Sequence, residues 1–349
     1  NIQLTSILVL LKVLVSSKIF MNYNLSYIPI VNAAASVLAS RFTNRQRILA
    51  VDHITISKID PNDWDLIFVL CAETTFKIRL ELDRLGDKAV LIHTSNEPGL
   101  EKYKRFFFPH WLFCVATVNS LMHTAEDYNF NKKSTAQYSY NALIGRAKDS
   151  RTKLLIELEQ KHLLDKGIIS YHPGGHYGPR LTLDPTPYYR NIWEWEDHVV
   201  QNMYSNDLNY TVKLDSTNRL IDGHFSSCLI PWKIINGSLV TVVSETDNMG
   251  SHSFVTEKTW KPFLSKHPAI FYATKNHEDF LESLGFEMYI KTNGDPQRVA
   301  SILSDIDRGG YKDYTLSDWR SIIIHNQSVA NPMNWIYKLH SWLEENFIR

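Results

Sequence analysis

The chain has 349 residues, of which 44% are hydrophobic and 21% charged, a composition typical of globular proteins and not of disordered ones. This length exceeds what one hydrophobic core usually organises, so two domains are expected. Lysine plus arginine and aspartate plus glutamate each number 37, which excludes the strong overall basic charge of many polyanion-binding proteins.

The first part of the chain alternates short apolar runs with stretches of helical periodicity. Strands are predicted at 47–51, 65–71, 89–93 and 111–116, and helices at 27–42, 76–85 and 120–128. Strands that alternate with helices of this length are typical of a doubly wound parallel sheet. The sequence therefore predicts an α/β, Rossmann-like domain over residues 1–136.

The polar segment 129–139 is the predicted linker into a second domain, residues 137–333. There the predicted strands are 168–171, 239–243 and 269–273, and the predicted helices are 152–164 and 297–306. A final amphipathic helix, residues 334–349, is expected to pack back on the first domain. Residues 188–222 show no clear pattern.

Three cations gather where a predicted strand passes into a helix. The strand that begins at Tyr140 is expected to end in a turn at Gly145 and Arg146, and Lys148 and Arg151 follow within one helical turn. Positive charge at a helix start opposes the helix dipole, which favours a bound anion over an ordinary solvated helix. Arg146, Lys148 and Arg151 are therefore candidate ligands of one anion.

A second candidate anion site lies between residues 239 and 272. A β-branched run ends in Ser244 and Glu245, and after a short spacer Thr256 is a predicted N-cap. Glu257 and Lys258 follow it at the helix start, where anions bind readily in open α/β sheets. A salt-bridged helix start is the alternative interpretation.

These residues carry a resemblance to a known family. The order Val-Val-Ser-Glu (242–245), Val-Thr-Glu-Lys (255–258) and Gly-Phe (285–286) resembles the donor-site segment of GT-B glycosyltransferases. The resemblance is closest to the α1,3-fucosyltransferase-like branch and to related phage- and virus-encoded sugar transferases. It implies two Rossmann-like domains that face each other across a cleft, with the C-terminal helix returning to the first domain.

The resemblance also implies roles for individual residues. Glu257 would hold the ribose of the nucleotide, and Lys258 would face the diphosphate together with the arginine-rich turn. Glu245 and Thr256 would shape the donor site. The spacer 247–253 departs from the fucosyltransferase pattern, and so does Lys261-Pro262. The resemblance covers about residues 140–290, so the sugar and the nucleotide stay open.

Glu97 is the candidate general base. It follows the predicted strand 89–93 and precedes Pro98-Gly99, which turn the chain away. An inverting sugar transfer needs a carboxylate that takes the proton from the attacking hydroxyl, and the resembled family has a glutamate in the equivalent loop. A loop carboxylate that caps the following helix explains Glu97 equally well.

The expected activity is transfer of a sugar from a nucleotide-diphosphate sugar to the hydroxyl of a glycan or of a hydroxymethylated DNA base. No cofactor and no metal are expected, because the cations would neutralise the departing diphosphate. Asp63-Trp64-Asp65 and Asp305-Ile306-Asp307 fit the metal-binding letters of GT-A transferases, but the first precedes its strand and the second lies late on a helix. A metal-dependent GT-A transferase and a non-catalytic sugar- or nucleic-acid-binding protein are the alternatives.

Three further features bear on partners and location. Cys71, Cys114 and Cys228 are far apart and are predicted to be buried thiols in a reducing, cytoplasmic compartment. The apolar run 7–15 is too short to span a membrane. The first 51 residues hold five basic residues and no acidic one, which fits contact with a phosphate backbone or an ordinary solvated surface.

Overall fold

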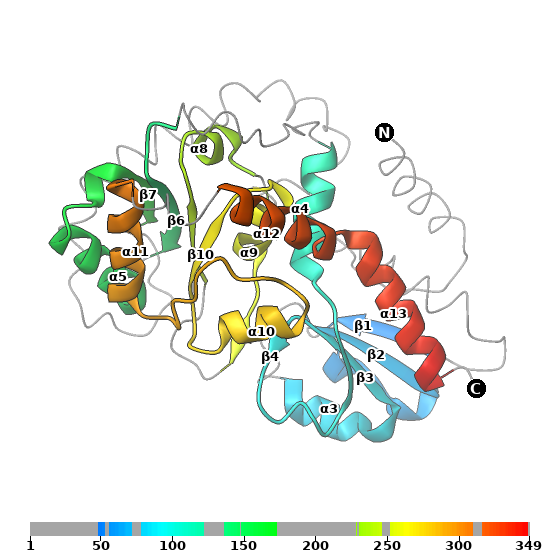
Figure 1. Cartoon of the computed structure of the whole chain (residues 1–349). Coiled ribbons are helices and arrows are strands. Elements are labelled where there is room, and N and C mark those ends of the chain that lie inside the picture. Colours follow the sequence, from blue (N-terminus) through cyan, green and yellow to red (C-terminus); the bar gives the residue numbers. More distant parts are fainter. Residues whose placement is uncertain are drawn as a thin grey trace, which may run out of the picture. The chain divides into compact units, whose positions relative to one another are not determined.

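A computed structural model describes residues 48–52, 56–71, 78–121, 136–146, 148–172, 228, 230–245, 252–309 and 316–347. Their contacts form two compact units, one from residues 1–120 and 331–349 and the other from residues 121–330. Each unit holds one four-stranded parallel sheet (Figure 1). The expected α/β class with parallel sheets is confirmed.

The first unit is built on the sheet β1-β2-β3-β5, in which every neighbouring pair is parallel. Its strands are β1 (Ile48–Asp52), β2 (Leu66–Cys71), β3 (Ala89–His93) and β5 (Lys104–Phe107), and the short β4 (Ser95–Asn96) follows β3. The central strand β3 is buried along its length and β2 nearly so. Burial on both faces explains why these two strands are continuous apolar runs.

Helices cover both faces of this first sheet. Leu82 of α3 (Arg79–Leu85) joins a core cluster with Ile67 and Val69 on one face. Phe68 points to the opposite face because side chains alternate along a strand. There it meets Phe347 of α13 (Pro332–Phe347), with 6.0 Å between ring centroids, and α13 runs along the strands in Figure 1.

One predicted strand of the first unit is wrong. Residues 111–116 belong to the helix α4 (His110–Leu121), and the fourth strand of the sheet is β5 instead. A short apolar run fits a strand and a buried helix equally well, so its pattern could not decide between them. The strand β5 was not predicted because Lys104 and Arg105 interrupt its apolar pattern. The predicted helix 27–42 and most of the predicted helix 120–128 lie outside the described residues.

The second unit contains the sheet β10-β8-β6-β7, which is also parallel. The strands are β6 (Tyr140–Arg146), β7 (Gly167–His172), β8 (Thr241–Ser244) and β10 (Ala269–Tyr272), with the short β9 (Ser253–Phe254) between the last two in sequence. The register of β6 shifts between Leu143 and Gly145, so that Gly145 and Arg146 still pair with β7. The expected turn at these two residues is therefore the end of the strand.

The helices of the second unit are α5 (Asp149–Gln160), α8 (Trp232–Asn236), α9 (Glu257–Leu264), α10 (His277–Ser283), α11 (Pro296–Asp307) and α12 (Leu316–Val329). The Tyr272 hydroxyl donates to the Ser150 carbonyl of α5 at 2.6 Å, whereas the neighbouring Phe271 packs on Phe263 of α9, with ring centroids 5.8 Å apart. Because neighbouring strand residues face opposite sides, α5 and α9 cover opposite faces of this sheet.

Short 3-10 helices complete the described chain at Ile56–Lys58, Pro61–Asp63, Gly86–Lys88 and Leu164–Lys166.

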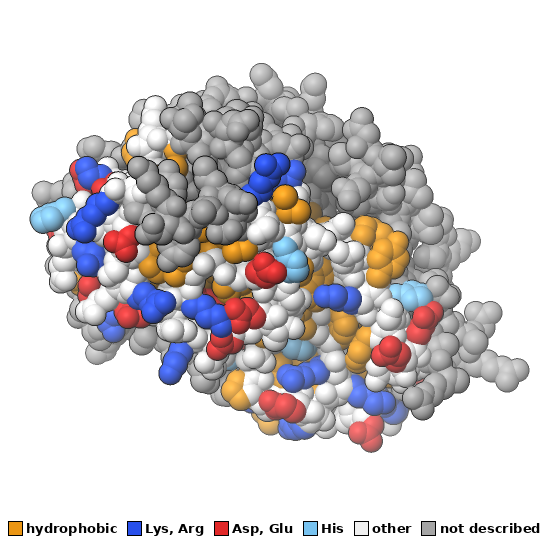
Figure 2. All heavy atoms as spheres, viewed as in Figure 1, with side chains coloured by type: hydrophobic (Ala, Val, Ile, Leu, Met, Phe, Trp, Pro, Cys, Tyr) orange, Lys and Arg blue, Asp and Glu red, His pale blue; other side chains and the backbone are white. Residues whose placement is uncertain are grey.

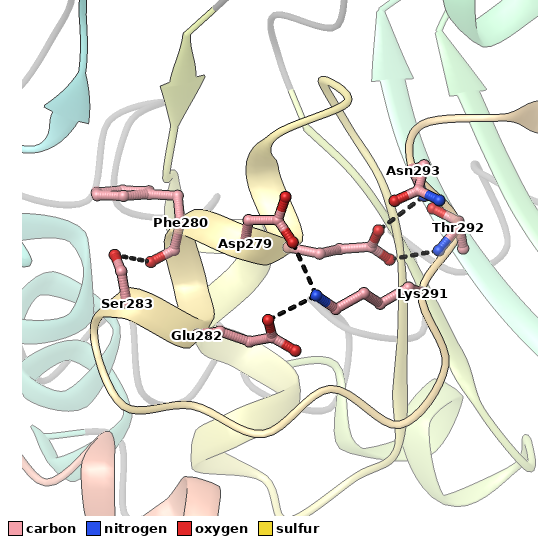
Figure 3. A network of polar contacts seen from close by, with 8 residues as sticks. Asp279, Phe280, Glu282, Ser283, Lys291, Thr292 and Asn293 are labelled. Carbon is pink, nitrogen blue, oxygen red and sulfur yellow. Dashed lines mark hydrogen bonds and ion pairs between the residues drawn. The ribbon is translucent and has the colours of Figure 1, made fainter.

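A network of charged groups fixes the turn that leads into α11. The Glu278 carboxylate accepts the backbone N–H groups of Thr292 and Asn293, each at 2.7 Å. Lys291 bonds to both Asp279 and Glu282 on α10 (Figure 3). Gly294 follows with φ of 70°, and a Cβ there would lie 2.3 Å from the Ala273 carbonyl oxygen, so only glycine fits this approach to the end of β10.

Candidate anion-binding site

The carboxyl ends of β6, β8 and β10 meet at one edge of the second sheet. Arg146 ends β6, Glu245 directly follows β8, and Tyr272 ends β10. The helices α5 and α9 begin at this edge because they follow β6 and β8 in the chain. In open α/β sheets ligands bind at such an edge, where the N–H groups of helix starts are available to anions.

The start of α5 brings a cation to this edge. Lys148 is the N-cap residue, and its carbonyl accepts the Thr152 N–H at 2.9 Å, but an ammonium has no acceptor with which to cap the helix. Arg151, in the first turn, is only 2% exposed. Its Nη2 donates to the backbone carbonyl of Glu245 at 3.4 Å, which holds the guanidinium beside the end of β8.

The start of α9 is tied to the same strand end by Glu245. Thr256 is the N-cap, as predicted, and its hydroxyl accepts the Lys258 N–H at 3.4 Å. The Glu245 carboxylate, 1% exposed, accepts the Thr256 hydroxyl at 2.6 Å and the Thr256 N–H at 3.1 Å. It also accepts the Thr259 hydroxyl at 2.5 Å. Three donors therefore fix this carboxylate under the first turn of α9.

Lys258 lies close enough to Arg151 for the two charges to repel. Burial of the partly exposed Lys258 side chain lowers its pKa to about 8, and the Arg151 guanidinium contributes in the same direction. The carboxylates of Glu257 and Glu245 oppose this shift, and Lys261 adds to it. Two cations from different elements thus share one region at the starts of two helices, an arrangement that a bound anion would stabilise.

The sequence-predicted donor residues fall into three groups. Arg151, Glu245, Thr256 and Lys258 come together, and Glu257 occupies the first position of α9, partly exposed. Lys148 is the partly exposed N-cap of α5. Arg146 ends β6, but its side chain lies outside the described part of the chain.

Two residues of the site were missed. Thr259 is three positions beyond the N-cap, a spacing at which side chains often bond back to a helix start, and this signal could have identified it. Tyr272 gave no local signal, because its contact with Ser150 depends on β10 lying two strands away from β6.

Glu97, the candidate base, belongs to the first unit and is 3% exposed. One carboxylate oxygen accepts the Ser95 hydroxyl at 2.8 Å, and the other pairs with Arg79 Nη2 at 3.4 Å. Nearby, His93 Nδ1 lies 2.6 Å from the Ser95 carbonyl oxygen, and burial lowers the His93 pKa to about 4. The roles of Glu97 as a base and as a capping carboxylate both stay predictions.

The described residues offer neither a metal-binding cluster nor a membrane-spanning helix. They contain no cluster of three or more His, Cys, Asp or Glu side chains suited to a metal ion. All three cysteines are within the described residues, and each is buried and outside any disulfide. Among the described helices none combines the length and apolar character needed to cross a bilayer. On the face shown in Figure 2, acidic and basic side chains are intermixed over the described residues.

No family model matches this chain, and no curated protein or solved structure matches it.

Proposed function

We propose that this chain is a glycosyltransferase of the GT-B type, which moves a sugar from a nucleotide-diphosphate sugar to an acceptor hydroxyl. The observation that carries the proposal is the pair Arg151 and Lys258 at the starts of α5 and α9. Two neighbouring cations at the starts of two helices, where backbone N–H groups are also available, form a favourable binding site for an anion. A donor diphosphate is such an anion.

The same groups suit the chemistry of sugar transfer. As the bond between the sugar and the diphosphate breaks, negative charge grows on the leaving phosphate oxygen. Fixed cations and backbone N–H groups aimed at that oxygen stabilise the transition state more than the ground state. Arg151 and Lys258 take this role. Lys148 adds charge from the N-cap of α5, Arg146 adds charge from the end of β6, and Glu257 receives the ribose.

In this proposal the second unit is the donor domain and the first is the acceptor domain. Both units are α/β with parallel sheets, as the GT-B arrangement requires. Glu97 takes the proton of the acceptor hydroxyl, and attack from the side opposite the diphosphate inverts the sugar. For this step Glu97 has to free one oxygen from Ser95 or Arg79. The acceptor is the hydroxyl of a glycan or of a hydroxymethylated DNA base.

A thermal-shift panel tests the donor site. A ligand at about 100 times its Kd stabilises the native state by about 2.7 kcal/mol, so nucleoside diphosphates and their sugar derivatives should raise the unfolding midpoint by several degrees. We expect this rise with manganese and equally with a chelator. The positive ligands are then incubated with the protein, and release of free sugar or transfer to an acceptor is measured.

The controls separate the parts of the proposal. If neither pyrophosphate nor any nucleoside diphosphate raises the midpoint, the donor site is absent and the proposal fails. A shift that a chelator abolishes and manganese restores contradicts the metal-independent mechanism. A shift without any turnover of nucleotide sugars leaves a nucleotide-binding protein and contradicts the transferase.

A further inference from the structure

Glu245 lies between the two charged partners of the candidate site. Its backbone carbonyl receives the Arg151 guanidinium at 3.4 Å, and its carboxylate receives the hydroxyls of Thr256 and Thr259. At 1% exposure it cannot be the group that meets an incoming nucleotide. Any influence on the ligand has to pass through another residue.

A short chain of hydrogen bonds leads from Glu245 to Lys258. The Lys258 N–H donates to the Thr256 hydroxyl oxygen at 3.4 Å, and that hydroxyl donates to Glu245 Oε2 at 2.6 Å. Because the carboxylate also accepts the Thr256 N–H at 3.1 Å, it holds the N-cap at two points. The backbone of Lys258 is thereby fixed relative to the end of β8.

The charges that act on Lys258 come from three elements. Arg151 of α5 and Lys261 of α9 disfavour its ammonium, whereas Glu257 of α9 and Glu245 after β8 favour it. Among the described residues, removing Glu245 would take away one of the carboxylates that favour this ammonium. A neutral Lys258 amine would then contribute no charge to the binding of a diphosphate.

We propose that Glu245 is a positioning residue of the anion site, which ties the first turn of α9 to β8 and supplies the negative charge that keeps the Lys258 ammonium charged beside Arg151. This inference rests on the proposed function, because it assigns the residue that prepares Lys258 for the donor diphosphate. It separates two roles, a mechanical tie and a counter-charge, that different substitutions remove.

Calorimetric titration of the full chain with inorganic pyrophosphate, from pH 6.5 to 9.5, tests the counter-charge. Wild-type affinity should fall above about pH 8, where Lys258 loses its proton. Pyrophosphate itself gains negative charge over this range, so a fall has to come from the protein. In Glu245→Gln we expect the fall to begin about one pH unit lower, an order-of-magnitude value for loss of one neighbouring charge.

Thr259→Val is the matched control. It removes one hydrogen bond to the carboxylate but leaves the charge of Glu245 in place. In this variant the pyrophosphate affinity should begin to fall at the same pH as in the wild-type protein, even if the variant is less stable. The counter-charge role is overturned if the affinity of Glu245→Gln begins to fall at the wild-type pH. It is also overturned if this pH shifts equally in both variants.

A second variant covers the case in which Glu245→Gln does not fold. Glu245→Asp withdraws the carboxylate by one methylene group. The pH at which pyrophosphate affinity begins to fall should therefore be lower than in the wild-type protein, but by less than in Glu245→Gln. A fall at or above the wild-type pH overturns the proposal. If pyrophosphate does not bind the wild-type protein at any pH, the proposed function fails and this inference with it, whereas binding with an unshifted Glu245→Gln profile overturns the inference alone.

Discussion

Two lysines of the second unit, Lys258 and Lys291, differ in the charges around them. Lys291 Nζ lies 2.7 Å from Asp279 and 2.6 Å from Glu282 (Figure 3). The hydrogen bonds to these two carboxylates raise the Lys291 pKa above its ordinary value. Lys258 has the opposite shift, because burial and Arg151 lower its pKa to about 8.

The difference points to different roles for the two lysines. The charge of Lys291 is neutralised inside the protein, where it joins α10 to the turn that Glu278 also holds. The surroundings of Lys258 disfavour its charge on balance, even with Glu245 and Glu257 nearby. Perturbed ionisation at the carboxyl edge of a parallel sheet is characteristic of functional sites, whereas a satisfied ion-pair network is characteristic of structure.

Glu97 is an exception to the rule that satisfied charges are structural. Its oxygens contact Ser95 and Arg79, much as the Lys291 ammonium contacts two carboxylates, yet it is the proposed base. If Glu97 is nevertheless the base, Glu97→Gln should lower kcat by roughly 100-fold or more and leave donor affinity unchanged. Steady-state kinetics and calorimetry measure the two quantities. Glu81→Gln, which removes an exposed ion pair with Arg84 in the same unit, should change neither. Turnover at the wild-type rate in Glu97→Gln would make Glu97 a structural charge.

Paired alanine substitutions test the comparison directly. Lys258→Ala removes a charge-assisted contact to the diphosphate and should weaken nucleoside diphosphate binding by roughly tenfold to a hundredfold. Lys291→Ala, in the same unit, should leave the affinity unchanged because its partners are Asp279 and Glu282. Calorimetry with both variants gives the ratio. If the two variants bind nucleoside diphosphate equally well, Lys258 has no special role in binding it.

Lys258→Met should increase the stability of the ligand-free protein, by roughly 1–3 kcal/mol at pH 7. The unfolded chain keeps the Lys258 proton up to its ordinary pKa of 10.5, but the folded chain only up to about 8. The wild-type protein therefore carries the full cost of this charge below pH 8, and the cost is relieved as pH rises from 8 to 10.5. Urea unfolding at pH 7 and pH 9.5 should show the gain shrinking at the higher pH. A destabilised variant at pH 7 would mean that Lys258 is structural.

The elements with strong local patterns were predictable. Buried parallel strands such as β2 and β3 are apolar throughout, and the N-cap at Thr256 uses a hydroxyl in its usual place. The exchange of β5 for residues 111–116 shows the limit. The strand β5 begins with two cations, and the helix α4 contains an apolar run that is typical of a strand. In both, packing against neighbouring elements overrides the local sequence preference.

The candidate site divides in the same way. The cations at one helix start and the Thr-Glu-Lys sequence at another could be recognised from the sequence, because capping and the helix dipole act within one turn. The sequence by itself thus determined two possible anion sites and the α/β class. The tertiary structure supplies the contacts that bring the two helix starts together: the strand order places β8 beside β6, so Glu245 meets both Arg151 and the first turn of α9. Strand order depends on the packing of whole layers, which no short stretch of sequence encodes.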